Sequence, residues 1–256
     1  MDKDLLHPSV IEMLKDLALV LKANGIEYYL VGAVARDIQL SASNEIISLR
    51  KTNDVDVAVM IQEEDHFYTI KDALIATGNF QAHPKEAIKV FYKHAIELDL
   101  LPFGEIESEA REIRLHKPNL FVINMPGFRE ILPHTEEKNI DDDLAIKVCT
   151  VEGIIILKLI AHDDRPQRTK DISDIEQLIK FYFELNDEDI YDTHFDLMET
   201  YDTQRSDYLE LVSARVIGRN IRKILDGSNG VTHRVRDILR KKQGALWQAM
   251  VHGIDD

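Results

Sequence analysis

The sequence predicts an α+β protein: a unit of strands and helices over residues 1–150, and a helical unit over residues 151–256. Before residue 150, short runs rich in β-branched and aromatic residues alternate with amphipathic stretches, which is typical of strands and helices in turn. After it, one helical pattern follows another. Segregation of this kind predicts an α+β unit followed by a helical one. A chain of 256 residues is long enough for two modest domains.

The mixed unit begins with a helix in "HPSVIEMLKDLALVLKANG", where apolar residues recur at helical spacing until Gly25. A strand is predicted at 26–31, a short helix in "GAVARDIQL", a polar connector in "SASNEIISLRK" and a second strand at 55–61. A helix that ends at Gly78 and three β-like runs, "NFQAH", "AIKVFYK" and "AIELDLLPF", precede a less regular region that reaches Thr150. In the helical unit, helices are predicted at 151–162, 171–184, 187–194, 205–225 and 232–242.

The net charge of −15 argues against general nucleic-acid binding, because non-specific affinity comes from neutralising phosphates. One basic region stands out, since residues 215–242 hold nine Lys and Arg against two acids. Its helices could dock RNA such as a tRNA end, or could pack on the core with solvated basic faces.

The single cysteine, Cys149, excludes an intrachain disulfide and suits a reducing compartment. The first residues, "MDKDLLHPSV", have no apolar signal region, and the most apolar segment, "VEGIIILKLIA", is too short to span a bilayer. We therefore expect a cytoplasmic protein with no membrane partner.

Two carboxylates stand at the start of the second strand, in "RKTNDVDVAVM". Asp54 and Asp56 are two residues apart, so their side chains point to the same face of a strand. Adjacent carboxylates repel each other unless a cation lies between them, and Mg²⁺ with oxygen ligands would supply one. The alternative is a strand end where both acids face water.

A third acid, Asp99, lies among leucines in "AIELDLLPF". If that strand lies beside the second strand, Asp99 completes a three-carboxylate cluster able to hold two metals for in-line displacement at phosphorus. Glu97 shares the same face and is a possible substitute. Taken alone, Asp99 could also be an ordinary acid at a strand edge.

Upstream, "YYLVGAVARD" predicts a strand, Gly32 and then a helix. A glycine there allows close approach to a ligand, and the helix N-terminus offers free N–H groups to a phosphate. Arg36 could add a cationic contact, oriented by Asp37. A strand–Gly–helix turn is also common in proteins without such a site.

Three segments in this order, "LVGAVARD", "TNDVDVAV" and "ELDLLPF", resemble the motifs of the nucleotidyltransferase superfamily, which includes DNA polymerase β and the tRNA CCA-adding enzymes. The sequence from Arg50 to Asp56 resembles the corresponding motif of bacterial AbiEii-type nucleotidyltransferase toxins. The resemblance implies a polymerase β-like fold, with a mixed sheet flanked by helices and a helical C-terminal domain. It also implies transfer of a nucleotide from an NTP to an acceptor hydroxyl, with Mg²⁺ or Mn²⁺. It implies catalytic and metal-binding roles for Asp54, Asp56 and Asp99, and nucleotide binding by Gly32, Ala33 and Arg36.

In the second half, "LKLIAHDDRPQRTKDISDIEQLI" is similar to the AbiEii-type segment with a helix lysine followed by K-D-x-x-D-I. The resemblance implies that Lys158 contacts the triphosphate and that Asp171 lies near the reacting groups. Asp174, three residues later, is predicted to have a structural rather than a catalytic role. From the residues alone, Lys158 could instead extend to water, and acids near a helix start are favoured by the helix dipole.

Two departures from the family pattern bear on activity. Ala33 stands where a glycine or serine usually follows the first glycine, and the connector between Gly32 and Asp54 is long. The Ala33 departure favours one alternative, a non-catalytic nucleotide-sensing module on the same fold, whereas the presence of all three acids favours the enzyme. A second alternative, compatible with enzymatic activity, is a toxin–antitoxin component that mainly binds a partner protein through its acidic surface. An enzymatic toxin would have an NTP, an RNA or protein acceptor and an antitoxin as partners.

Overall fold

The computed structural model describes residues 6–41 and 54–256. The chain divides into two compact units, and the division falls between Thr150 and Val151. The first unit holds residues 6–39 and 54–150, whereas Leu40 and Ser41 go with the second. Most of the predicted connector, with Arg50, lies outside the described residues. None of the helices in the described ranges has the length and apolar character needed to cross a membrane.

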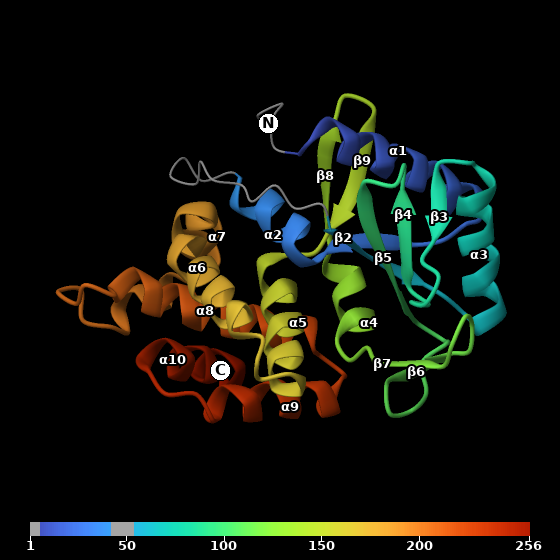
Figure 1. The fold of residues 1–256 in the computed structure, drawn as a ribbon. Coiled ribbons are helices and arrows are strands. Elements are labelled where there is room, and N and C mark those ends of the chain that lie inside the picture. Colours follow the sequence, from blue (N-terminus) through green and yellow to red (C-terminus); the bar gives the residue numbers. More distant parts are fainter. Residues whose placement is uncertain (1–5, 42–53) are drawn as a thin grey trace. The chain divides into compact units, whose positions relative to one another are not determined.

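The described strands of the first unit form one seven-stranded sheet in the order β3-β4-β5-β2-β1-β9-β8, with a separate β6-β7 hairpin (Figure 1). The pairs β2-β5 and β1-β9 are parallel and the other neighbours antiparallel, so the predicted mixed sheet is confirmed. The strands are β1 (Tyr28–Val31), β2 (Asp54–Met60), β3 (Phe80–Ala82), β4 (Lys89–Tyr92), β5 (Ile96–Phe103), β6 (Glu112–Leu115), β7 (Phe121–Asn124), β8 (Glu136–Asp141) and β9 (Leu144–Val148).

Helices cover both faces of this sheet. On one face, Asp16 of α1 accepts hydrogen bonds from the Tyr92 hydroxyl and the Asn79 amide, both at 2.8 Å. On the other, the Tyr29 hydroxyl donates to the Phe128 carbonyl of α4 at 2.8 Å. The helices of this unit are α1 (Pro8–Ala23), α2 (Gly32–Leu40), α3 (Glu64–Ala76) and α4 (Phe128–Ile131).

Side chains along β2 alternate between a buried apolar face of the sheet and a face that carries the two aspartates. Val55, Val57 and Val59 are buried on the α1 face, where Leu98 and Leu100 of β5 are the register partners of the first two. Asp54 and Asp56 therefore point to the face that α4 covers farther along the strand.

The second unit is helical, as predicted, and α5 forms its centre. Eight of the fourteen residues of α5 are buried, so the helix is enclosed on most sides. Its Glu152 accepts hydrogen bonds from the hydroxyl of Tyr182 and the amide of Asn220, which links α5 to α6 and α8. The helices are α5 (Val151–Asp164), α6 (Thr169–Leu185), α7 (Asp187–Thr193), α8 (Tyr208–Ile224), α9 (Asn229–Arg240) and α10 (Ala245–Asp255).

The sequence analysis did not predict α10, nor the β8-β9 hairpin and α4 in the less regular region. Helix α10 packs directly against α8, where a Cβ on Gly253 would lie 2.0 Å from the Arg215 carbonyl oxygen. The glycine that makes this contact possible also weakens the local helical signal. Strand β8, "EEKNID", is a charged edge strand without alternation, so its pairing with β9 depends on tertiary context.

Candidate active site

Four carboxylates line one end of the parallel β2-β5 pair. In register, Asp54 lies opposite Glu97 and Asp56 lies opposite Asp99. Because the register keeps alternate residues in step, all four side chains point to the same face of the sheet. The adjacency on which the predicted cluster depends is thus present, and Glu97 joins it as a fourth acid.

Gly32 lies directly against this cluster. It has a φ of +68° at the junction of β1 and α2, a conformation that favours glycine. A Cβ built on Gly32 would be 2.1 Å from Oδ2 of Asp56, far inside contact distance. The glycine therefore serves both the turn and the position of the Asp56 carboxylate, and α2 begins next to that carboxylate.

Lys89 of β4 is a member of the cluster that the sequence analysis missed. In the antiparallel β4-β5 pair it lies opposite Asp99, its ammonium donates to Glu97, and it is 3.8 Å from Asp99 Oδ1. The hydrogen bond to Glu97 raises the pKa of Lys89. The sequence did contain an indication, because a lysine inside the apolar strand "AIKVFYK" needs an anionic partner. The identity of that partner follows only from the strand pairing.

The ionised form of Asp99 is disfavoured by its surroundings. Burial raises the pKa of its carboxyl, and the negative charges of Glu86, Glu97 and Asp54 add to that rise against the opposing charge of Lys89. Its Oδ1 is buried without a hydrogen bond to any described residue. A carboxylate in this state favours the approach of a cation or a proton donor.

The donor set fits a hard divalent cation, because it consists of carboxylate oxygens on one face. As the side chains stand, the described parts of the chain contain no group of three or more His, Cys, Asp and Glu arranged to hold a metal. Mg²⁺ is commonly held by one or two carboxylates together with substrate phosphates, so a complete protein cage is not required. The metal roles of Asp54, Asp56 and Asp99 stay predictions.

Within α2, Arg36 is buried, with 4% of its surface exposed, and its Nε and Nη2 donate to Asp37 Oδ1 at 2.9 and 2.6 Å. The expected pairing of Arg36 with Asp37 is therefore found. Ala33 is half-buried as the second residue of this helix. A phosphate contact of either residue stays a prediction.

In the second unit, Lys158 of α5 bonds to two acids of α6. Its Nζ lies 3.1 Å from Asp171 and 2.8 Å from Asp174, and Arg168 donates to Asp171 at 2.7 Å. Burial raises the pKa of Asp171, but the hydrogen bond from Arg168 and the charge of Lys158 outweigh it and hold that pKa below the usual value. Lys158 thus has partners within its own unit, and its role toward a triphosphate stays a prediction.

The basic stretch of the C-terminal helices is largely neutralised. Six of its nine cationic side chains, Arg215, Arg219, Arg234, Arg236, Arg240 and Lys241, lie in ion pairs with aspartates of the same unit. Arg219, for example, is 2.6 Å from both Asp196 and Asp256. These pairs support the interpretation that the helices pack in the core with balanced outer faces, and weaken that of an RNA-docking surface.

A parallel strand pair with aligned acids, next to a strand–glycine–helix turn, is the arrangement expected of a nucleotidyltransferase. The chain belongs to the family described as nucleotidyl transferase AbiEii toxin, type IV toxin–antitoxin system, which matches residues 45–253. The resemblance inferred from the motifs is thereby confirmed.

Solved structures offer weaker similarities. A solution structure of the antibiotic-resistance factor ANT(2″)-Ia aligns with a TM-score of 0.40 and 11% identity, over 87% of this chain and 97% of that one. A crystal structure of ANT(2″)-Ia in complex with adenylyl-2″-tobramycin gives 0.41 and 12%, over 83% and 99%. An antigenic nucleotidyltransferase-like protein from Paracoccidioides brasiliensis gives 0.38 and 14%, over 90% and 94%. Curated proteins gave no match. The family assignment depends on the sequence match alone.

Proposed function

We propose that this chain is a metal-dependent nucleotidyltransferase that transfers a nucleotide from an NTP to an acceptor hydroxyl. The observation that carries the proposal is the register of β2 and β5, which sets Asp56 beside Asp99 and Asp54 beside Glu97 on one face. Family membership supports the reaction type. Residues 1–150 would form the nucleotidyltransferase domain and residues 151–256 the helical domain.

Asp54, Asp56 and Asp99 would hold Mg²⁺ or Mn²⁺, which when bound neutralises the charge of the triphosphate. The N–H groups at the start of α2, at Gly32 and Ala33, would bind phosphate oxygens. The close contact of Gly32 with Asp56 puts this helix start beside the carboxylates, where the triphosphate would have to lie.

In the proposed reaction, the acceptor oxygen forms a bond to the α-phosphorus. The bond from that phosphorus to the oxygen bridging the β-phosphate breaks, and pyrophosphate leaves with that oxygen. The proton of the hydroxyl passes to the Asp99 carboxylate, whose Oδ1 has no hydrogen bond to a described residue.

Lys158 and Asp171 would act from the helical domain, with Lys158 on the triphosphate and Asp171 near the reacting groups. Because Lys158 is bonded to both Asp171 and Asp174, a triphosphate would have to draw its ammonium away from these acids. Arg168 would then continue to balance Asp171.

The family description supports a toxin role with an antitoxin as partner. We propose that the acceptor is a macromolecular hydroxyl, on RNA or protein. The neutralised C-terminal helices do not favour RNA, and labelling of RNA or of protein distinguishes the two acceptors.

The test is transfer of label from α-³²P NTPs to total RNA and protein with Mg²⁺ or Mn²⁺. Label should appear with the wild type and disappear in Asp54→Ala and Asp56→Ala, whereas Asp142→Ala, on the exposed β8-β9 turn, should label normally. Thermal unfolding with and without Mg-NTP gives a second measurement, since a bound ligand stabilises the folded chain. Stabilisation without transfer would support the non-catalytic module that Ala33 suggests, and neither stabilisation nor transfer would refute the proposal.

A further inference from the structure

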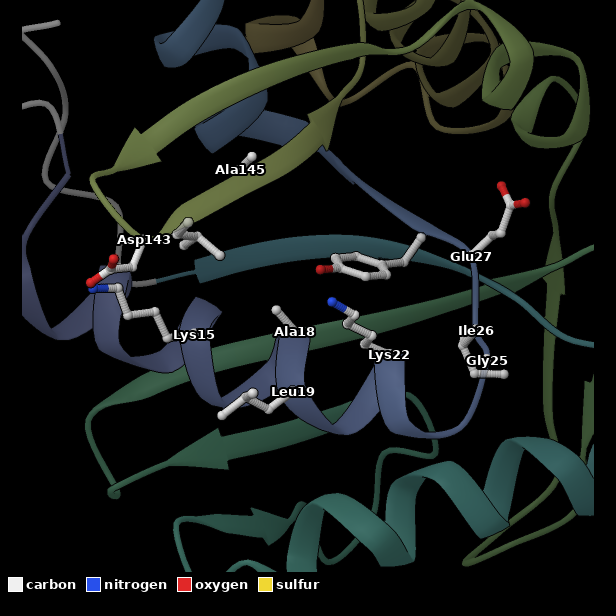
Figure 2. Close-up of a pocket in the computed structure, with 11 residues that line it drawn as sticks. Lys15, Ala18, Leu19, Lys22, Gly25, Ile26, Glu27, Asp143 and Ala145 are labelled. Carbon is white, nitrogen blue, oxygen red and sulfur yellow. The ribbon is translucent and has the colours of Figure 1, made fainter.

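A second site lies on the first unit, in a pocket of about 600 Å³ between α1 and the β8-β9 turn (Figure 2). Figure 2 shows Lys15, Ala18 and Lys22 on the side of α1 that faces the strand carrying Ala145. The lining residues are Lys15, Ala18, Leu19, Lys22, Gly25, Ile26, Glu27, Tyr28, Asp143, Leu144 and Ala145. A volume of this size is in the range of small-molecule sites.

The pocket lies on the opposite face of the sheet from the carboxylates. Tyr28 and Tyr29 are consecutive in β1, so they point to opposite faces. Tyr29 pairs with Ala58, which shares the face of Asp56. Tyr28, which lines the pocket, is therefore on the α1 face, and a ligand here would not touch the proposed catalytic acids.

The charges around the pocket do not balance evenly. Lys15 is bonded to Asp141 at 2.5 Å, and Glu27 is bonded to Lys147 at 3.0 Å. Asp142 and Asp143 act on Lys15 as well, so at that end of the pocket the acids outnumber the base. Among the described residues, Lys22 has no ion pair or side-chain hydrogen bond.

The Tyr28 hydroxyl likewise has no hydrogen-bond partner in the described parts of the chain. Burial raises the pKa of Tyr28, so this hydroxyl stays a neutral donor. Lys22 and Tyr28 together thus offer two donors and a positive charge to an anion, at the end of the pocket away from Asp143.

The rest of the lining is apolar. Ala18, Leu19, Ile26, Leu144 and Ala145 form it, and Leu19 is 68% exposed, so its side chain is accessible to a ligand. A lysine in the last turn of α1 is explained by the helix dipole alone. The dipole does not explain an apolar hollow with an exposed leucine beside that lysine.

We propose that this pocket binds a small organic anion with an apolar body, of the medium-chain carboxylate class. The carboxylate accepts hydrogen bonds from Lys22 and Tyr28, and the apolar body lies over Ala18, Leu19 and Leu144. The site is independent of the NTP site, on the other face of the sheet.

The test is calorimetric titration of the full chain with sodium decanoate, and with 1-decanol as an uncharged control. The proposal expects saturable one-to-one binding of decanoate and clearly weaker binding of decanol. Lys22→Gln should weaken decanoate binding by about tenfold, the size expected for a lost charge-assisted hydrogen bond. Lys85→Gln, a matched change on an exposed lysine outside the pocket, should leave the affinity unchanged.

Two further measurements locate the ligand. Ala18→Trp should abolish binding by filling the pocket, and saturating Mg-ATP should leave the decanoate affinity unchanged. If Ala18→Trp does not fold, Tyr28→Phe, with an expected loss of severalfold, takes its place. The proposal is overturned if decanoate does not bind, if decanol binds as well as decanoate, if Lys22→Gln binds like the wild type, or if Mg-ATP displaces decanoate.

Discussion

Replacement of Gly32 by alanine tests the link between the turn after β1 and the proposed catalytic acids. The new Cβ would lie 2.1 Å from Asp56 Oδ2, whereas Cβ contacts under 3.0 Å essentially do not occur. The Asp56 carboxylate would have to move by roughly 1 Å. A misplacement of that size in a catalytic group costs about 100-fold in rate. The variant should therefore transfer label at about one hundredth of the wild-type rate, or less.

The same change strains the backbone, and the chain contains a matched control for that strain. Gly32 has a φ of +68° and Gly25 a φ of +67°, but nothing lies within 4 Å of a Cβ built on Gly25. Alanine at either position should cost about 1–2 kcal/mol of unfolding free energy from the left-handed backbone. Only Gly32→Ala should also lose activity.

Denaturant unfolding and the ³²P transfer assay, run on both variants, separate the two effects. Wild-type transfer by Gly32→Ala would show that Asp56 can move freely or takes no part, and would refute the reasoning. Equal loss of activity in Gly25→Ala would assign the effect to strain rather than to the carboxylate.

Three further predictions concern charge and packing. Lys89→Gln removes the cation beside Glu97, so Mg²⁺ should bind about fivefold more tightly, as shown by titration of thermal stability. The lowered pKa of Asp171 contributes stability that is present above its ordinary pKa of 3.8 and is lost as pH falls through the folded value. Asp171→Asn should therefore be less stable at pH 7 and lose less stability between pH 5 and pH 2 in urea unfolding. Gly253→Ala should lower the free energy of unfolding by about 1–3 kcal/mol, because the backbones of α8 and α10 are in contact at Gly253.

Each of these has a clear contrary result. Unchanged or weaker Mg²⁺ binding in Lys89→Gln would mean that the lysine does not compete with the metal. A pH profile of Asp171→Asn parallel to that of the wild type would exclude Asp171 as a source of acid sensitivity. For Gly253→Ala the control is Gly230→Ala in α9, where a Cβ meets nothing within 4 Å, and equal stabilities of the two variants would contradict the packing argument.

The sequence predicted those parts of the fold that local periodicity determines. Alternation in "DVDVAVM" identified a strand with both acids on one face, and the structure has that strand as β2. The pairing of Asp56 with Asp99, rather than with Glu97, depends on the register of two strands separated by α3, β3 and β4. No local pattern contains that information.

Lys89 and Gly32 show the same limit at the level of single residues. The sequence shows a lysine in an apolar strand and a glycine at a turn, and each observation is correct. That Lys89 lies opposite Asp99, and that Gly32 lies against Asp56, are contacts across the sheet. The residue types of the candidate site were readable from the sequence, whereas their contacts and electrostatic balance required the tertiary structure.

The C-terminal helices show what composition alone leaves open. Nine cationic residues within 28 positions allowed either an RNA-docking surface or helices packed on the core, and six of the nine have aspartate partners, among them Asp163, Asp196 and Asp255. Paired charges release few counterions when a nucleic acid binds, so they add little affinity for RNA. If an RNA is the acceptor, its contacts must therefore come mainly from other surfaces, or must break ion pairs that stabilise the helical unit.

The same pairs make that unit sensitive to acid, because the Arg215 and Arg219 hydrogen bonds hold the pKa of Asp256 below its usual value. Most of the basic stretch is thus accounted for by ion pairs within the helical unit, without an acceptor.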